Sequence, residues 1–214
     1  MSASKTDGRI TKGEATRQRL VSAALKVFAE LGFSRATIKD IGAAAGVSPA
    51  LLYHYFPSKE DLLNAVVERF GPIGDVRRFI EQYEALPAAD FIRKLARHFY
   101  DLLGERLDLV RIFLREGTSN GSVADAWRGM IQRGLPIIQG YFLRQVLMGR
   151  LRPHNTEVTV RALSTTIVML RFSENVFPLQ TLTGHQFIDE FIDNLMAGLR
   201  PDIPEIFGHN TAAS

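Results

Sequence analysis

Apolar residues near the start of the chain recur every three or four positions, which is the spacing of one face of an α-helix. The first such run covers residues 14–31 and ends at Gly32, since glycine lets a chain leave a helix at little cost. The apolar face consists of Leu20, Val21, Ala24, Leu25, Phe28 and Leu31. The pattern predicts a long amphipathic helix that packs on one side.

Two shorter helices are predicted directly after it, separated by a tight turn. Thr37 and Asp40 have the spacing of a capping box, in which the hydroxyl and the carboxylate each accept a backbone N–H of the first turn. Gly46 can end this helix, Ser48 is a good N-cap, and Pro49 suits the first position of the next helix. Two capped helices across a short turn form a helix-turn-helix.

The pattern changes at Gly71-Pro72. Before it, a helix that starts at the capping box of Ser58 and Asp61 completes a first domain, residues 1–70. After it, residues 71–214 show helical spacing again and no alternating run long enough for a sheet, although Pro136 should cause a kink or a helix boundary. The segments are Val76–Tyr83, Phe91–Leu103, Leu107–Glu116, Val123–Met148, Val158–Val176 and Phe187–Leu199. The sequence therefore predicts an all-α protein of two domains.

Net positive charge is confined to the first domain. Residues 1–70 hold ten Lys or Arg and seven Asp or Glu, whereas residues 71–214 hold sixteen of each kind. Residues 1–12 form a polar, basic stretch that is typical of a flexible arm. The arm could bind DNA phosphates or serve as a solubilising tail, and the sequence supports both interpretations.

Composition narrows the class of protein. A hydrophobic content of 46% over 214 residues is ample for a core, and the chain has no cysteine for a disulfide or a thiol nucleophile. The start of the chain lacks the apolar run of a signal peptide, and no later segment has the length of a membrane span. We therefore expect a cytoplasmic protein without membrane contact.

The second helix of the helix-turn-helix has the chemistry of a groove reader. It carries no Lys or Arg, and its small and hydroxyl side chains suit thymine methyls and base edges. Polar and basic side chains around it suit phosphates. The predicted DNA-binding residues are Arg17, Arg19, Thr37, Ser48, Pro49, Ala50, Tyr53, His54 and Lys59. The alternative is a plain helical hairpin in which Tyr53, His54 and Tyr55 only shield a small core. Beneath the helix-turn-helix we expect a core of Phe28 and Phe33 with the neighbours Val47, Leu51, Phe56 and Leu62.

Residues 17–63 resemble the DNA-binding region of the tetracycline-repressor (TetR) family of bacterial regulators. The resemblance rests on RLVSAALKVFAELGF and ATIKDIGAAAGVSPALLYHYFPSKEDLL, of which LYHYFPSKEDLL is the most specific part. Gly42 departs from the family, which usually has Ala there, and a glycine inside a helix costs about 1 kcal/mol relative to Ala. The resemblance implies a homodimeric regulator, most often a repressor, that leaves a palindromic DNA operator when a small-molecule effector binds.

The resemblance also implies that the second domain encloses the effector pocket. Aromatic side chains and a few polar anchors are typical of such sites. Our candidates are Phe99, Phe113, Trp127, Tyr141, Gln145, Met169, Phe172 and Asn175. For any single one of them, an ordinary core role is the more frequent one for such a side chain. For Arg111, Arg115 and Glu116 we favour an exposed helix face over an anion site.

The last predicted helix carries an apolar stripe of Ile188, Phe191, Ile192, Leu195 and Leu199. In the resembled family two C-terminal helices pair with their twins in a four-helix bundle, which implies a dimer interface here. A two-fold dimer also suits the reading of a palindrome. The alternative is that the stripe is buried within one chain.

Nothing in the sequence resembles an assembled catalytic site. The five histidines are scattered, with no HExxH, no GxSxG and no spacing of metal ligands. We therefore predict no enzyme activity, no cofactor and no metal. The remaining alternatives to a gated regulator are an ungated architectural DNA-binding protein and a helical enzyme or sequestering protein that keeps a DNA-binding fold.

Overall fold

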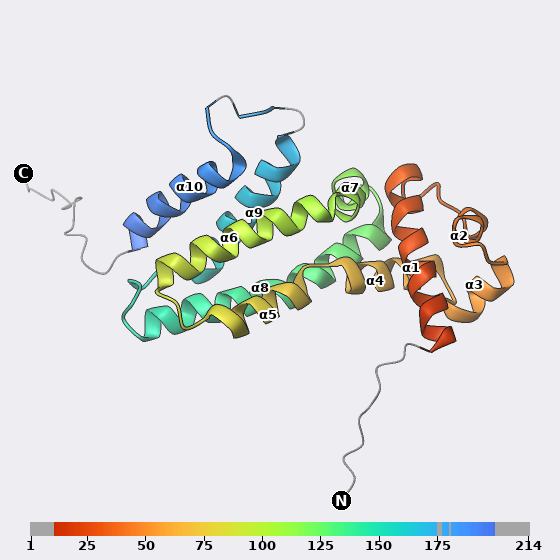
Figure 1. Ribbon diagram of the computed structural model, residues 1–214, viewed down its shortest axis with the longest axis horizontal. Helices are drawn as coiled ribbons and strands as arrows, with labels where there is room; N and C mark the ends of the chain where they lie inside the picture. The colour runs from red at the N-terminus through yellow and green to blue at the C-terminus, as the bar shows by residue number, and fades with distance from the viewer. Residues whose placement is uncertain (1–10, 175–176, 180, 200–214) are drawn as a thin grey trace, which may run out of the picture. The chain divides into compact units, whose positions relative to one another are not determined.

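The computed structural model describes residues 11–174, 177–179 and 181–199, and over these residues it is built of helices without strands (Figure 1). The all-α class predicted from the sequence is therefore confirmed. The chain divides into two compact units, each made of two segments. Of the described residues, those of 11–71 and 106–131 form unit 1, and those of 72–105 and 132–199 form unit 2.

Unit 1 starts with four helices, which are α1 (Lys12–Leu31), α2 (Ile38–Ala45), α3 (Pro49–Tyr55) and α4 (Lys59–Phe70). α1 packs against α2 and α4, and α2 against α3. Their apolar faces meet in one core, in which the rings of Phe28 and Phe33 lie 5.2 Å apart, edge to face. This core fixes α3, the second helix of the helix-turn-helix.

A second segment, residues 106–131, completes unit 1. The division predicted from the sequence placed this segment in the second domain, because it assigned every residue after 70 to that domain. The segment contains α7 (Leu107–Glu116) and the first part of α8 (Gly121–Leu147). Its apolar residues Ile112, Phe113 and Val123 are buried in the core of α1 and α4, and Trp127 packs against that core. Helical periodicity had identified these residues as apolar faces, but it carries no information about which neighbour covers them.

Polar contacts hold the loop between α1 and α2 from two sides. Glu116, only 8% exposed, accepts hydrogen bonds from the backbone N–H (2.9 Å) and hydroxyl (2.5 Å) of Ser34. Gly32 has a left-handed φ of 86°, and a Cβ there would lie 2.3 Å from Glu116 Oε1. On the other side, Lys59 Nζ donates to the carbonyls of Phe33 (2.8 Å) and Ala36 (3.1 Å). The loop therefore depends on both α4 and α7 for its shape.

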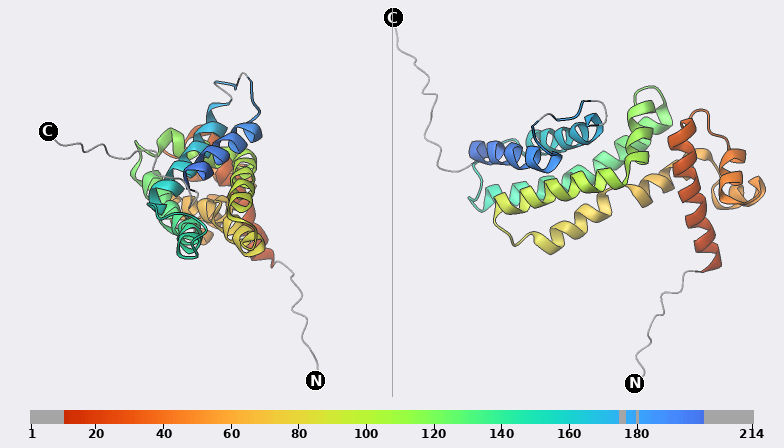
Figure 2. Two further views of the ribbon diagram at one scale, coloured as in Figure 1. Left: turned by 90° about the vertical axis from the view of Figure 1, so that its left-hand side faces the viewer. Right: turned by 45° about the horizontal axis from the view of Figure 1, so that its top comes forward.

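Unit 2 contains α5 (Ile73–Tyr83), α6 (Ala88–Glu105), the rest of α8, α9 (Thr156–Ser173) and α10 (Gly184–Leu199). α6 packs against α5, α9 and α10, and the views of Figure 2 show α10 alongside α6. Tyr141 and Phe142 of α8 and Phe91 and Ile92 of α6 are fully buried. Unit 2 therefore has an apolar core of its own.

Ion pairs and hydrogen bonds connect the helices of unit 2. Arg97 and Arg93 of α6 pair with Asp189 and Asp193 of α10. The hydroxyl of Tyr100 hydrogen-bonds to both carboxylate oxygens of Glu174 (2.6 and 2.7 Å), and Arg171 donates to that hydroxyl at 3.0 Å. Burial, followed by the Glu174 carboxylate, raises the pKa of Tyr100. These polar contacts thus link α6 to α10 and to the end of α9.

α8 contains Pro136 and contributes residues to both units, which divide between Ile131 and Gln132. A helix boundary at the proline was one expectation, but the helix continues through it. Because proline has no N–H, the carbonyl of Gln132, four residues earlier, loses its usual helical hydrogen bond. Among the described residues, no helix is both long and apolar enough to cross a bilayer.

Candidate nucleic-acid interface

The helix-turn-helix starts at Thr37, where the predicted capping box is present. Thr37 Oγ1 accepts from the backbone N–H of Asp40 (3.2 Å), and the Asp40 carboxylate accepts from the backbone N–H (2.9 Å) and hydroxyl (2.6 Å) of Thr37. The hydrogen bonds from the Thr37 hydroxyl and backbone lower the pKa of Asp40. Thr37 itself is exposed at this helix start.

The turn between α2 and α3 is closed by backbone contacts. Gly46 has a left-handed φ of 65°, and the N–H of Val47 donates to the carbonyl of Gly42 at 2.9 Å. A Cβ at Gly42 would lie only 3.0 Å from the carbonyl oxygen of Val47. Glycine at this position, a small departure from the resembled family, therefore permits a very close approach of the turn to α2.

Helix α3 presents the predicted reading residues to solvent. Ser48 caps the helix by accepting the N–H of Leu51 at 3.2 Å, and Pro49 occupies its first turn. Leu52 and Phe56 anchor the helix in the core. The residues exposed around its start and outer face are Ser48, Pro49, Ala50, Leu51, Tyr53 and His54. The structure therefore brings these residues, all predicted to bind DNA except Leu51, together on one surface.

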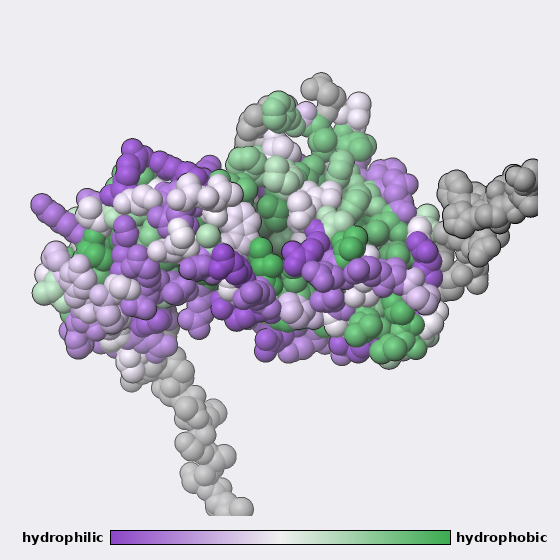
Figure 3. Space-filling model, turned by 180° about the vertical axis from the view of Figure 1, so that it is seen from behind, coloured by the Kyte–Doolittle hydropathy of each residue, from purple (hydrophilic) through white to green (hydrophobic). Residues whose placement is uncertain are grey.

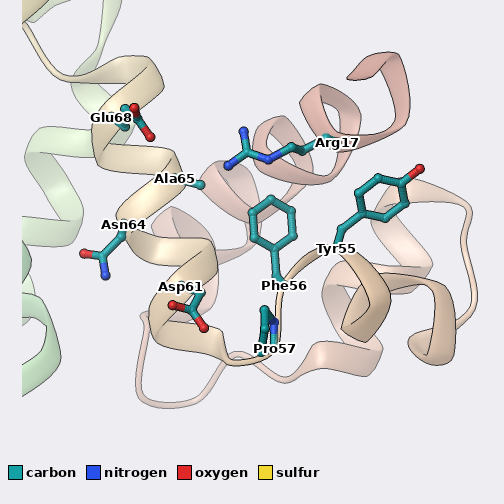
Figure 4. Close-up of a pocket in the computed structure, with 8 residues that line it drawn as sticks. All are labelled: Arg17, Tyr55, Phe56, Pro57, Asp61, Asn64, Ala65 and Glu68. Atoms are coloured by element: carbon teal, nitrogen blue, oxygen red, sulfur yellow. The ribbon is translucent and has the colours of Figure 1, made fainter. Parts of the chain in front are cut away.

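A groove lies beside α3, between α1 and α4 (Figure 4). Its volume is about 300 Å³, and its lining consists of Arg17, Tyr55, Phe56, Pro57, Asp61, Asn64, Ala65 and Glu68. The guanidinium of Arg17 lies 5.1 Å from the centre of the Phe56 ring, an attractive cation–π geometry. Arg17 and Arg19 are both exposed near the start of α1, so their predicted phosphate contacts are sterically open.

Lys59 has a structural role that the sequence did not reveal. Two of the three donors of its ammonium group bind the carbonyls of Phe33 and Ala36, and the group lies 4.5 Å from the centre of the Phe33 ring. A phosphate contact by the remaining donor stays a prediction. Replacing Lys59 is therefore expected to disturb the α1–α2 loop as well as any contact with DNA.

Sequence reasoning missed two residues of this surface. Lys39, in the first turn of α2, is exposed, and its position one residue before the capping Asp40 could have indicated a phosphate contact. Leu51 was expected in the core but is 40% exposed. Its neighbour Leu52 takes the buried position, because consecutive residues on a helix point about 100° apart.

The predicted effector-pocket residues are distributed over both units. Phe113 and Trp127 belong to unit 1, where their rings lie 5.0 Å apart. Tyr141 and Gln145 are buried in unit 2, and Phe99 is half-buried there. Met169 and Phe172 are exposed on α9, and Asn175 lies outside the described residues. Of the predicted set, Tyr141 and Gln145 thus remain as buried candidates in unit 2.

The predicted dimer stripe on α10 also divides. Ile188, Ile192 and Leu199 are buried within the chain, as in the alternative interpretation of this stripe, while Phe191 and Leu195 remain half-exposed. Exposed large apolar side chains lie on α9, with Val158, Met169 and Phe172, and also at the end of α8, with Leu143, Leu147 and Met148. Seen from behind, unit 2 displays large hydrophobic areas (Figure 3).

Comparisons with known proteins match the helix-turn-helix. Residues 20–66 match the family described as "Bacterial regulatory proteins, tetR family". The chain is 33% identical over 119 residues to the HTH-type transcriptional regulator UidR of Escherichia coli strain K12. That alignment covers 55% of this chain and 60% of the relative, so the chain spans less than two thirds of the relative's length.

Solved structures match over nearly the whole chain. Salmonella enterica GusR has a TM-score of 0.71 at 23% identity, covering 88% of this chain and 98% of its own. FadR from Bacillus subtilis, solved in complex with stearoyl-CoA, has a TM-score of 0.71 at 20% identity, covering 85% and 98%. At these identities the likeness establishes the fold.

Proposed function

We propose that this chain, a member of the tetR family of bacterial regulatory proteins, is a transcriptional regulator. It acts in the cytoplasm as a homodimer that binds a palindromic operator. The homodimer releases the operator when a small-molecule effector binds. The observation that carries this proposal is the outer surface of α3. A capped and anchored helix there presents hydroxyl and small apolar groups without any competing role in the core. The likeness to transcriptional regulators also argues against enzyme activity.

The surface of α3 fits sequence reading in the major groove. Ser48 and Tyr53 offer hydroxyls, and Ala50 and Leu51 offer apolar contacts to thymine methyls. Arg19 of α1 and Lys39 of α2 are exposed cations of the same unit. Most of the non-specific affinity would come from such cations, whereas the few contacts of one short helix would supply modest selectivity. A second copy is needed to reach the selectivity of a dedicated operator.

The exposed face of α9 fits the contact with that second copy. Val158, Ala162, Thr165, Met169 and Phe172 are all exposed and alternate at spacings of four and three residues. This heptad spacing is the pattern of a helix that packs along another helix. α10 packs against α9, and half-exposed Phe187, Phe191 and Leu195 extend its apolar surface. The proposed dimer therefore uses the outward faces of both helices.

Effector control requires a change that passes from unit 2 to unit 1. Residues 106–131 are part of the DNA-reading unit, yet they follow α6 and precede the second part of α8 in the chain. A movement of either helix would therefore act on α7 and, through Glu116, on the loop that leads into α2. A hundredfold release of DNA requires an effector that prefers the released state by about 2.7 kcal/mol.

The proposal is tested by selecting bound duplexes from random DNA with the purified protein over a series of salt concentrations. We expect enrichment of a palindrome, with half-sites about one helical turn apart, and affinity that falls steeply with salt. Enrichment of an asymmetric single site would exclude the dimeric reader. Salt-sensitive binding without any enriched sequence would favour the ungated architectural alternative.

A further inference from the structure

Tyr141 is a buried polar residue without a polar partner. Its side chain is 0% exposed, and its hydroxyl has no hydrogen bond in the part of the chain that the structure describes. The ring stacks on that of Phe91, with centres 3.8 Å apart and planes at 23°, and meets the ring of Phe142 edge-on at 6.1 Å. Phenylalanine could make all of these ring contacts.

Other buried atoms without a partner differ from this hydroxyl. Arg93 Nε, His154 Nε2 and Arg171 Nε also lack a hydrogen bond. Each of them belongs to a side chain that binds through another atom, to Asp193, to the carbonyl of Arg152 and to Tyr100 respectively. The hydroxyl is the sole polar atom of the Tyr141 side chain, so this side chain has no hydrogen bond to any of the described residues.

An unpaired buried hydroxyl is rare because the folded protein loses its hydrogen bond to water without a replacement. Burial also raises the pKa of Tyr141 to about 12, so the hydroxyl keeps its proton at neutral pH. Tyr141 therefore offers an O–H donor to an acceptor that the described residues do not provide. An acceptor from outside the chain would complete the hydrogen bond.

The charges around the hydroxyl also favour an acceptor. Arg150 and Arg144 act on it with positive charge and Glu84 with negative charge. Glu84 pairs with Arg144 at 3.2 Å, whereas Arg150 donates to the amide oxygen of Gln145 at 3.4 Å and has no acidic partner among the described residues. The net positive environment suits an electron-rich oxygen and disfavours an ammonium group.

We infer that Tyr141 is the polar anchor of the effector site in unit 2, and that the effector is a small, mainly aromatic molecule with one acceptor oxygen, a carbonyl or a carboxylate. The inference rests on the proposed function, because it supplies the binding group for the effector of that proposal. The flat body of the effector packs among the rings of Phe91 and Phe142, and its oxygen accepts from the Tyr141 hydroxyl.

Helix α8 provides a way for such a molecule to enter a closed core. The segment that carries Tyr141 and Gln145 follows Pro136, where one helical hydrogen bond is missing. Helices bend most readily at such positions. A bend there would move the ring of Tyr141 relative to Phe91. It would also act on the part of α8 that belongs to unit 1, because the two units divide within this helix.

The first test compares two tyrosines of unit 2 by thermal unfolding of protein that was denatured and refolded to remove bound molecules. Tyr141→Phe removes an unpaired hydroxyl, so we expect the Tm to rise by about 2 °C or more. Tyr100→Phe is the matched control, because its hydroxyl is bonded to Glu174 and Arg171, and there the Tm should fall. A fall for Tyr141→Phe as well would show that its hydroxyl is already satisfied and would overturn the inference.

The second test uses three probes with the same aromatic body, which are naphthalene, 2-acetylnaphthalene and 2-naphthoate, and measures binding by calorimetry. The wild type should bind at least one oxygen-bearing probe about tenfold more tightly than naphthalene, and Tyr141→Phe should lose that preference. Preference for the ketone or for the carboxylate identifies the oxygen. A wild type that binds no probe more tightly than Tyr141→Phe does would overturn the inference.

A third measurement separates this inference from the proposed gating, by following the release of the selected DNA duplex with the tightest probe. Release from the wild type and equally from Tyr141→Phe would reject the role of Tyr141 and leave the regulator proposal standing. Binding that depends on Tyr141 without any release would support the site and reject control of DNA binding by this ligand class.

Discussion

The two units differ in how many of their polar groups find a hydrogen-bond partner, and how much of their apolar surface is buried, within a single chain. In unit 1, the caps of α2, α3 and α4, the carboxylate of Glu116 and the ammonium of Lys59 all have partners within the unit. Unit 2 instead leaves the hydroxyl of Tyr141 unpaired and the apolar face of α9 exposed. A unit whose polar groups are paired within the chain suits the reading of DNA by a fixed surface. An unpaired hydroxyl and an exposed apolar face suit a unit that must bind other molecules.

The largest expected effect comes from breaking the anchor of α3. Leu52 is fully buried beneath the reading surface, so Leu52→Ala should lower the free energy of unfolding by about 3 kcal/mol. Chemical denaturation with urea measures this change. The matched control is Leu51→Ala, since its exposed side chain should barely affect stability but should alter the selected DNA sequence. Equal losses of stability in the two variants would contradict the placement of α3.

The next effect concerns the contact between α7 and the α1–α2 loop. Glu116→Ala leaves the N–H and hydroxyl of Ser34 without their acceptor and should cost about 2 kcal/mol. Urea denaturation, followed by DNA binding of the folded protein, measures both consequences. Glu84→Ala removes an exposed pair with Arg144 in unit 2 and should cost less than about 0.5 kcal/mol. Equal losses of unfolding free energy in Glu116→Ala and Glu84→Ala would contradict the structural role of Glu116.

The third effect is on assembly rather than on folding. Met169 is 46% exposed in the single chain, so Met169→Glu should leave monomer stability nearly unchanged. In the proposed dimer it buries a charge in the apolar contact, and we expect dimerisation to weaken at least tenfold, or about 1.4 kcal/mol. Sedimentation velocity over a range of concentrations measures this. Met148→Glu, also exposed but outside the α9 stripe, serves as the control and should remain dimeric.

The smallest effect separates two lysines of unit 1. Lys59→Ala removes hydrogen bonds to two carbonyls and should lower stability by about 1 kcal/mol. Lys39→Ala removes an exposed charge, so stability should hold while the salt dependence of DNA binding falls by about one phosphate. Urea denaturation and DNA titrations over several salt concentrations distinguish them. A changed salt slope with unchanged stability for Lys59→Ala would restore it as a simple phosphate contact.

Sequence reasoning succeeded where the determinants are local. The caps at Thr37, Ser48 and Ser58 and the turn at Gly46 involve residues within four positions of each other, so their spacing was enough to place three helix starts. The exposed residues of α3 followed from the same local signals, except for Leu51, which had been expected in the core. These features account for most of the candidate interface.

Sequence reasoning failed where the outcome depends on distant partners. Periodicity identified Phe113 as an apolar position but could not show that it belongs to the core of unit 1 rather than to unit 2. It likewise found the stripe of Ile188 and Ile192 without showing that the chain buries it itself. The partners of Lys59 are more than twenty residues away, so no spacing rule applies to them.

Unit 1 is made of two separate segments of the chain, and this limits how its DNA-reading part can be joined to domains of related proteins. A reader cut off after Gly71 would lack Ile112, Phe113 and Val123, which cover its core. Designers of hybrid biosensors who wish to attach this reader to a foreign effector domain should therefore transfer residues 106–131 together with residues 1–71. The splice points should lie between residues 71 and 72, 105 and 106, and 131 and 132, where the chain passes from one unit to the other.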